Sequence, residues 1–143
     1  MTKQRLEGHF RDALKVHPNI WFMKLQVNPM AHCITVGDFM LLTEHSNIVI
    51  ECKERKGKAF SFGDWTQRNL MLEFYYAVPR NDAYAILCFW RGRRSKSLYY
   101  LLSAVKFDEY IKNSPKKSCN IDDLNAITKP LALEEITSFL THL

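Results

Sequence analysis

The stretch Gly37–Lys53, GDFMLLTEHSNIVIECK, contains two short apolar runs separated by a polar break. The runs are Phe39–Leu42 and Ile48–Ile50, and the break Thr43–Asn47 between them is typical of a hairpin turn. If the hairpin closes around His45, residues whose numbers sum to about 90 face each other across the two strands. The stretch therefore predicts two neighbouring antiparallel strands, and the rest of the chain is interpreted around them.

Charged residues lie at the outer ends of these strands: Asp38, Glu51 and Lys53. Because alternate strand residues share a face, Glu51 and Lys53 should project together, while Ile50 and Cys52 take the other face. The pairing places Asp38 beside them, with opposed β-carbons roughly 5 Å apart. Unpaired charges beside apolar strands are costly, and a divalent cation would relieve that cost. The alternative is a surface hairpin with an ordinary Glu–Lys pair, worth under about 1 kcal/mol.

Length and composition bound the class of protein. A chain of 143 residues suits one compact domain, here with a helical tail at about residues 121–143. Its hydrophobic fraction of 47% indicates a globular rather than a disordered chain. No apolar run reaches the roughly 18 residues that span a bilayer, and the polar, amphipathic N-terminus is unlike a secretory signal. We therefore expect a soluble, cytoplasmic protein. The net charge of +5 is compatible with a polyanionic partner without requiring one.

The four cysteines are scattered without CxxC spacing, which argues against a zinc site. They are Cys33, Cys52, Cys88 and Cys119, and most lie in apolar contexts where a thiol behaves as a small hydrophobe. We expect reduced, structural cysteines.

The N-terminal part predicts a helix over Thr2–Val16 and a strand over Ile20–Val27, followed by a connector at Asn28–Val36. The buried stripe of the helix should consist of Leu6, Phe10, Ala13 and Leu14. Glu7 lies on the margin of that stripe, where a carboxylate is either a solvated flank or an acid aimed into a site. Lys24, within the strand, either faces a phosphate or faces solvent.

Downstream of the hairpin, the run Glu54–Lys58 is either a solvated turn or a set of phosphate contacts beside the acids. Phe60 and Phe62 should pack beneath that loop. Asp64 is expected to cap a helix that runs to about Val78. Its core stripe should be Leu70, Phe74, Ala77 and Val78, with Gln67 extending that stripe at its start.

The C-terminal half predicts a strand buried on both faces, Ala83–Trp90, and a return strand, Ser97–Leu102. The turn between them, Arg91–Lys96, carries four cations that serve either solubility or DNA contact. A short helix over Ala104–Lys112 precedes a polar linker, and the tail should form one or two helices broken at Pro130.

The Gly37-Asp38 strand followed by Glu51-Cys52-Lys53 resembles the core of the PD-(D/E)xK nuclease superfamily. The segment KERKGKAFSFGDWTQRNLM further resembles the Holliday-junction resolvases of the RecU and Hjc type, which occur in phages as well as bacteria. Gly37 departs from the family's usual proline. The expected fold is a restriction-endonuclease-like α/β (α+β) core, a mixed sheet flanked by helices in the order α-β-β-β-α-β-β-α. The family's projecting segment at the connector looks abbreviated here.

This resemblance implies metal ligands and catalytic residues. The ligands would be Glu7, Asp38, Glu51 and the backbone carbonyl of Cys52, and such hard oxygen donors favour Mg²⁺, or Mn²⁺ as a substitute. Lys53 would position the attacking water and stabilise developing charge rather than act as a general base, because neighbouring carboxylates favour the charged amine. Gln67 would be an auxiliary residue that orients the lysine, the water or the phosphate.

The function implied by the resemblance is metal-dependent cleavage of four-way DNA junctions by a homodimer. A restriction or repair nuclease of this fold is one alternative, and a non-catalytic DNA-binding protein is another. The cations expected to contact DNA are Lys24, Arg55, Lys56, Lys58, Arg68, Arg91, Arg93 and Arg94.

Overall fold

The computed structural model describes residues 2–26 and 35–143. Most of the expected connector Asn28–Val36 lies outside these residues, as does Val27 at the expected end of the first strand. The elements run in the order α1 (Thr2–Leu14), β1 (Trp21–Lys24), β2 (Phe39–Leu42), β3 (Asn47–Arg55), β4 (Ala59–Ser61), a 3₁₀ turn (Phe62–Asp64), α2 (Arg68–Ala77), β5 (Asn81–Phe89), a second 3₁₀ turn (Arg94–Lys96), β6 (Leu98–Ser103), α3 (Ala104–Asn113), β7 (Ser118–Asn120), α4 (Ile121–Ile127) and α5 (Leu133–Thr141).

Five strands form the central sheet in the order β1-β2-β3-β5-β6. The β3–β5 pair is parallel and the other pairs are antiparallel, so the sheet is mixed. A parallel pair needs a crossover connection. Here the crossover contains β4 and α2, which packs against β5. The expected mixed sheet flanked by helices is confirmed.

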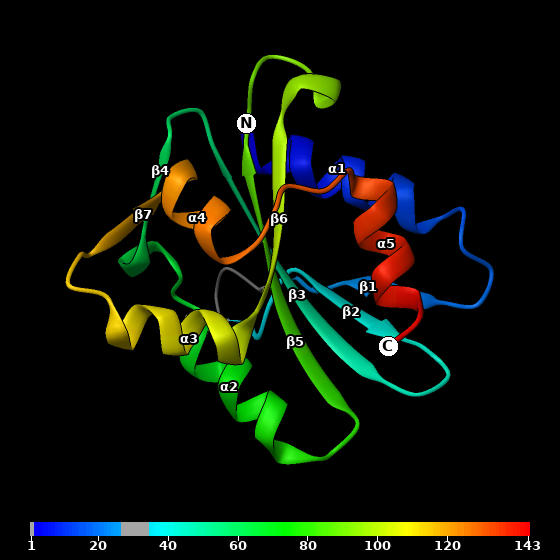
Figure 1. Cartoon of the computed structure of the whole chain (residues 1–143). Coiled ribbons are helices and arrows are strands. Elements are labelled where there is room, and N and C mark those ends of the chain that lie inside the picture. Colours follow the sequence, from blue (N-terminus) through cyan, green and yellow to red (C-terminus); the bar gives the residue numbers. More distant parts are fainter. Residues whose placement is uncertain (1, 27–34) are drawn as a thin grey trace.

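Helices cover both faces of this sheet (Figure 1). On one face, α1 and α5 pack over the side chains of β3 and β5 that include Ile50, Cys52 and Ile86. On the other face, Val49 and Leu87 pack with residues of α2 and α3. β3 and β5 therefore bury side chains on both sides, as their nearly continuous apolar sequences predict.

The first helix follows its predicted pattern. Leu6, Phe10, Ala13 and Leu14 are all buried against the sheet. The tail forms two helices, α4 and α5, separated by a segment that contains Pro130, also as expected. β1 is shorter than predicted, since its ladder with β2 ends at Lys24. One further backbone bond follows, from the Leu25 N–H to the Asp38 carbonyl at 2.8 Å.

The prediction for α2 was wrong in its start and in its buried face. Asp64 does not cap the helix: it ends a 3₁₀ turn and pairs with Arg55, and Gln67 occupies the N-cap position. Leu70 and Val78 are 36% and 46% exposed and Ala77 is exposed as well, whereas Met71 is fully buried. Of the predicted stripe, Phe74 packs against the core. The helix sequence carries apolar residues on several sides, so periodicity alone does not determine which side faces the sheet.

A second, two-stranded sheet pairs β4 with β7, and the sequence interpretation missed it. Each strand has three residues, too few for a recognisable alternation. Phe60 and Phe62 are buried and contact the α3 ring of Phe107, which confirms that they pack beneath the loop.

Three of the cysteines, Cys52, Cys88 and Cys119, are buried free thiols. Burial raises the pKa of Cys88 to about 12 and that of Cys119 to about 11. Such thiols are almost never ionised, so a structural role for these three is confirmed. Cys33 lies outside the described residues. No helix among the described residues is long and apolar enough to cross a membrane.

Candidate active site

Asp38 and Glu51 are neighbours across the β2–β3 ladder. The register ends with Phe39 paired to Ile50, and Asp38 directly precedes Phe39. The Asp38 N–H donates to the Ile50 carbonyl at 2.7 Å, and Asp38 Oδ2 accepts the Cys52 N–H at 2.8 Å. The pairing expected from the hairpin is thus confirmed, and both the backbone and the carboxylate of Asp38 are fixed to β3.

Glu51 and Lys53 project to the same face of β3, and Cys52 points to the other. The Glu51 side chain is completely buried, and Lys53 Nζ lies 3.1 Å from its Oε2 with only 13% of the lysine side chain exposed. Desolvating a carboxylate and an ammonium costs several kcal/mol for each ion, so this pair differs from an ordinary surface pair. The surface-hairpin alternative is therefore excluded.

Glu7, Asp38 and Gln67 line one cleft of about 430 Å³, together with Lys24. Glu7 comes from α1 and Lys24 from β1, while Asp38 directly precedes β2 and Gln67 is the N-cap of α2. Four separate segments therefore meet at this cleft. Glu7 is not a solvated flank, because its side chain is mostly buried and pairs with Lys24. The Gln67 Oε1 is buried and has no hydrogen-bond partner among the described residues. Such an acceptor is costly to leave unpaired.

These acids do not form a complete set of metal ligands in the described part of the chain. Within residues 2–26 and 35–143, no group of three or more His, Cys, Asp or Glu side chains is spaced to hold a metal ion. Glu7 has the Lys24 ammonium as its cation, and Glu51 has Lys53. The donor types nevertheless fit a hard cation, since the Asp38 carboxylate bonds to the N–H of Cys52, the residue after Glu51.

Several cations predicted to contact DNA have protein partners. Arg55 pairs with Asp64, Arg68 with Asp108 and Arg94 with Glu134. Lys56, Lys58 and Arg93 are exposed and have no acidic partner among the described residues. Lys24 faces Glu7, and Arg91 contacts backbone carbonyls, as described below.

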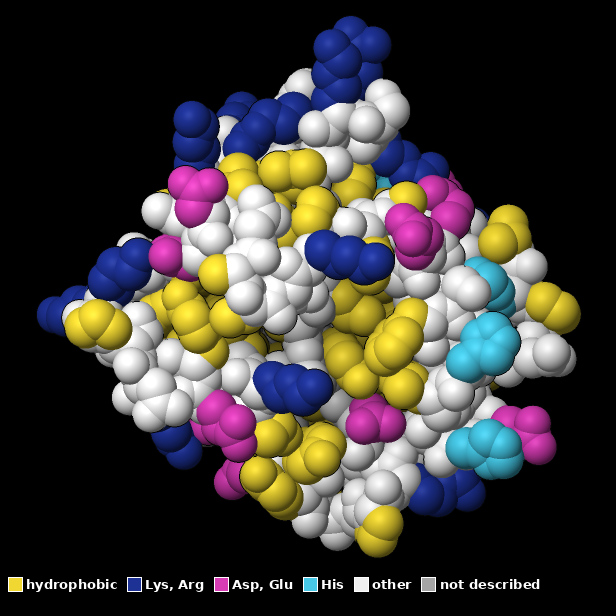
Figure 2. Space-filling view, viewed as in Figure 1, with side chains coloured by type: hydrophobic (Ala, Val, Ile, Leu, Met, Phe, Trp, Pro, Cys, Tyr) yellow, Lys and Arg dark blue, Asp and Glu magenta, His cyan; other side chains and the backbone are white. Residues whose placement is uncertain are grey.

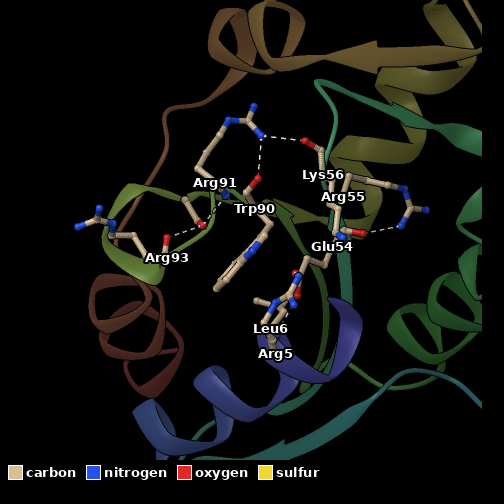
Figure 3. A network of polar contacts seen from close by, with 9 residues as sticks. Arg5, Leu6, Glu54, Arg55, Lys56, Trp90, Arg91 and Arg93 are labelled. Carbon is tan, nitrogen blue, oxygen red and sulfur yellow. Dashed lines mark hydrogen bonds and ion pairs between the residues drawn. The ribbon is translucent and has the colours of Figure 1, made fainter. Parts of the chain in front are cut away.

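Glu54 is a buried residue whose role the sequence interpretation missed, because it was grouped with the basic run. Its side chain accepts the Leu6 N–H at 3.0 Å and pairs with Arg5 at 3.3 Å, and the Arg5 guanidinium lies 4.4 Å from the centre of the Trp90 ring (Figure 3). The alternation of the strand could have predicted that Glu54 is buried. Glu54 has the same strand parity as Ile50 and Cys52, which places it on the face that α1 covers.

A separate cavity of about 570 Å³ lies between β6, α3 and the segment that precedes α5. Apolar side chains such as Leu101, Phe107 and Phe139 line it, and it contains none of the predicted site residues. The predicted site residues Glu7, Asp38 and Gln67 lie instead in the smaller, polar cleft.

A mixed five-stranded sheet flanked by helices, with acidic residues where β2 begins and within β3, defines a restriction-endonuclease-like fold. Among solved structures, the chain is similar to Hjc from Archaeoglobus fulgidus, a Holliday junction resolvase from an archaeal hyperthermophile. The similarity covers 94% of this chain and 98% of that one, with a TM-score of 0.60 and 14% sequence identity. The likeness shows an Hjc-type nuclease fold. No protein-family model matches the sequence, and a search of curated proteins finds no match.

Proposed function

We propose that this protein is a metal-dependent endonuclease that cleaves four-way DNA junctions. One observation carries the proposal: Asp38 bonds to Ile50 and Cys52, the residues on either side of the buried Glu51 that pairs with Lys53, in a fold of the Hjc type. A structural role alone does not account for burying this ion pair, because its desolvation cost would be avoided by apolar residues of similar volume. A catalytic site does account for it.

Asp38 and Glu51 would hold the cation, with the backbone carbonyl of Cys52 between them in the chain. Bound Mg²⁺ would neutralise the non-bridging phosphate oxygen and lower the pKa of a water molecule. Lys53 is held by Glu51, and its ammonium would stabilise charge that develops on the phosphate. Gln67 would accept a hydrogen bond from the attacking water, which would give its buried Oε1 the partner it lacks within the described part of the chain.

Glu7 would join the site only after it exchanges its partner. In the structure its carboxylate pairs with the Lys24 ammonium at the mouth of the cleft. The Lys24 side chain is long and 38% exposed, so its ammonium can move away when a substrate phosphate or a cation enters the cleft. The Lys24 ammonium therefore competes with a metal ion for the Glu7 carboxylate.

A second candidate is a DNA-binding protein of this fold that does not cleave. The Glu7–Lys24 pair and the lack of a three-acid group in the described parts of the chain favour it. The intact Asp38, Glu51, Lys53 and Gln67 set favours the nuclease.

Incubating the protein with a labelled four-way junction, and with linear duplexes of the same sequence, tests the proposal. We expect cuts in the junction that require Mg²⁺ and that exceed those in linear duplex. Equal cutting of both substrates would instead indicate a restriction or repair nuclease. Binding without cutting in Mg²⁺ or Mn²⁺ would support the second candidate. Sedimentation of the protein with and without the junction tests the expected homodimer.

A further inference from the structure

Two basic loops begin at the same end of the central sheet, where β3 and β5 have their carboxyl ends. β3 and β5 are parallel neighbours, so the loop Lys56–Lys58 that follows β3 and the turn Arg91–Lys96 that follows β5 emerge side by side. The Trp90 N–H donates to the Arg55 carbonyl at 2.7 Å, which extends the parallel ladder to the point where the loops begin. Figure 3 shows Lys56 and Arg91 facing each other across this gap.

Arg91 joins the two loops. Its Nη1 donates to the carbonyls of Lys56 at 3.3 Å, Gly57 at 3.2 Å and Trp90 at 3.0 Å. Its backbone N–H donates to Ser97 Oγ at 3.0 Å, and that hydroxyl donates to the Arg93 carbonyl at 2.8 Å. One guanidinium thus fixes the course of one loop, and its own backbone is fixed within the other (Figure 3).

The joined loops carry cations that are not neutralised. Lys56, Lys58, Arg93 and Lys96 are exposed, and none has an acidic partner in the part of the chain that the structure describes. The partners of Arg91 are carbonyls, so its charge is retained as well. Lys and Arg side chains gather at the upper end of Figure 2, where Figure 1 places the β5–β6 turn. We call these five residues the basic rim.

We infer that the basic rim binds the sugar–phosphate backbone of a duplex arm outside the cleft, and that Arg91 is the positioning residue that holds its two loops together. The inference rests on the proposed function. β3 carries Glu51 and ends at Arg55, one residue before Lys56 of the basic rim. From Glu51 to Arg55 the strand rises about 13 Å, at roughly 3.3 Å per residue. That rise matches about four base pairs of a duplex, at 3.4 Å per step. With the duplex axis along β3, the rim would contact phosphates about four base pairs from the cut.

The test uses binding of a labelled four-way junction, without divalent metal, over a range of salt concentrations. Arg91→Lys keeps the charge, but its ammonium lies one bond closer to the backbone than Nη1, so it falls short of the Lys56 and Gly57 carbonyls that Nη1 contacts at 3.3 and 3.2 Å. Arg80→Lys is the matched control, because Arg80 also donates to a backbone carbonyl, that of Glu44, at 3.3 Å at the other end of β5. We expect Arg91→Lys to weaken binding about tenfold and to reduce the salt slope by about 1, as loss of one or more phosphate contacts would.

Hydrogen exchange of the free protein separates positioning from direct phosphate contact. If Arg91 positions the loops, two bonded loop amides exchange faster in Arg91→Lys without DNA, while they match wild type in Arg80→Lys: the Trp90 N–H, which donates to the Arg55 carbonyl, and the Ile121 N–H, which donates to the Lys58 carbonyl. The inference is overturned if Arg91→Lys binds the junction with wild-type affinity and slope, or if the loop amides are unchanged. If the wild-type protein cleaves junctions and Arg91→Lys binds them with the same affinity and salt slope, the proposed function survives and this inference alone fails. If wild type binds no DNA, both fail.

Discussion

Gly37 sits where the backbone of β3 leaves no space for a side chain. A β-carbon at this position would lie 2.8 Å from the Ile50 carbonyl oxygen, closer than carbon and oxygen normally approach. The neighbouring Asp38 N–H donates to that same carbonyl. The close approach explains why this chain has glycine at position 37, and it ties this residue to the placement of Asp38.

We predict that Gly37→Ala destabilises the protein by about 1–3 kcal/mol, the usual cost of forcing an extra carbon into a packed region. The added methyl group must push β2 away from β3, so junction cleavage should fall as well. Denaturant unfolding gives the stability, and Gly63→Ala is the control, because a β-carbon there meets nothing closer than 4.0 Å. Equal stability of the two variants would contradict this account of Gly37.

Glu54 fixes the first turns of α1 to the end of β3. It is buried, and it accepts the Leu6 N–H, one residue before Glu7 in the chain. We predict that Glu54→Ala costs about 2–3 kcal/mol, because it leaves a buried N–H unsatisfied and removes the partner of Arg5. Glu54→Gln should cost less, since its amide oxygen can still accept the bond. Thermal unfolding compares both with Glu109→Ala on the exposed side of α3. No loss in Glu54→Ala would refute the role.

At the scale of elements, an ion-pair network joins α2 to α3. Asp108 on α3 lies 2.5 Å from Arg68 Nη2 on α2 and 3.1 Å from Lys112 Nζ. Burial alone would raise the pKa of Asp108, but the hydrogen bonds from Arg68 and Lys112 outweigh it and lower the pKa below 3.8. The carboxylate is therefore more acidic in the folded protein than in the unfolded chain.

This shift predicts a specific pH dependence. Because the folded-state pKa is the lower one, the stabilisation is complete above 3.8 and is lost as the pH falls through the folded-state value. Unfolding free energies measured from roughly pH 6 downward should therefore decline more steeply for wild type than for Asp108→Asn in this acid range. Parallel curves for the two proteins would contradict the network.

The elements also show where sequence reasoning stops. The β2–β3 register could be predicted, because a short polar break between two apolar runs leaves few ways to close the hairpin. The inward face of α2 could not, since Met71 competes with Leu70 and the aromatic residues of the same helix. The β4–β7 pair joins segments that are distant in the sequence, and neither segment alternates for long enough to reveal a strand.

At the scale of the whole molecule, the cleft depends on contacts that the sequence does not encode locally. The sequence alone predicted Asp38, Glu51 and Lys53, because they lie within one hairpin. Glu7 and Gln67 came only from a family resemblance, and the packing of α1 and α2 around the sheet brings them to the same cleft. The ion pair between Glu7 and Lys24 could not be foreseen, because it depends on how α1 packs on the sheet.

The cleavage rate of the Asp38→Asn variant tests the central claim most directly. An asparagine oxygen can still accept the Cys52 N–H, so the fold and junction binding should persist. Asp12→Asn, which removes a 66% exposed carboxylate on α1, is the matched control. With labelled junction in Mg²⁺ and excess enzyme, we predict that Asp38→Asn cuts at least about 100-fold more slowly than wild type, since even residues that only support a metal ligand are worth 10–100-fold. Asp12→Asn should cut at the wild-type rate. Cutting by Asp38→Asn at that same rate would contradict the assignment of this site.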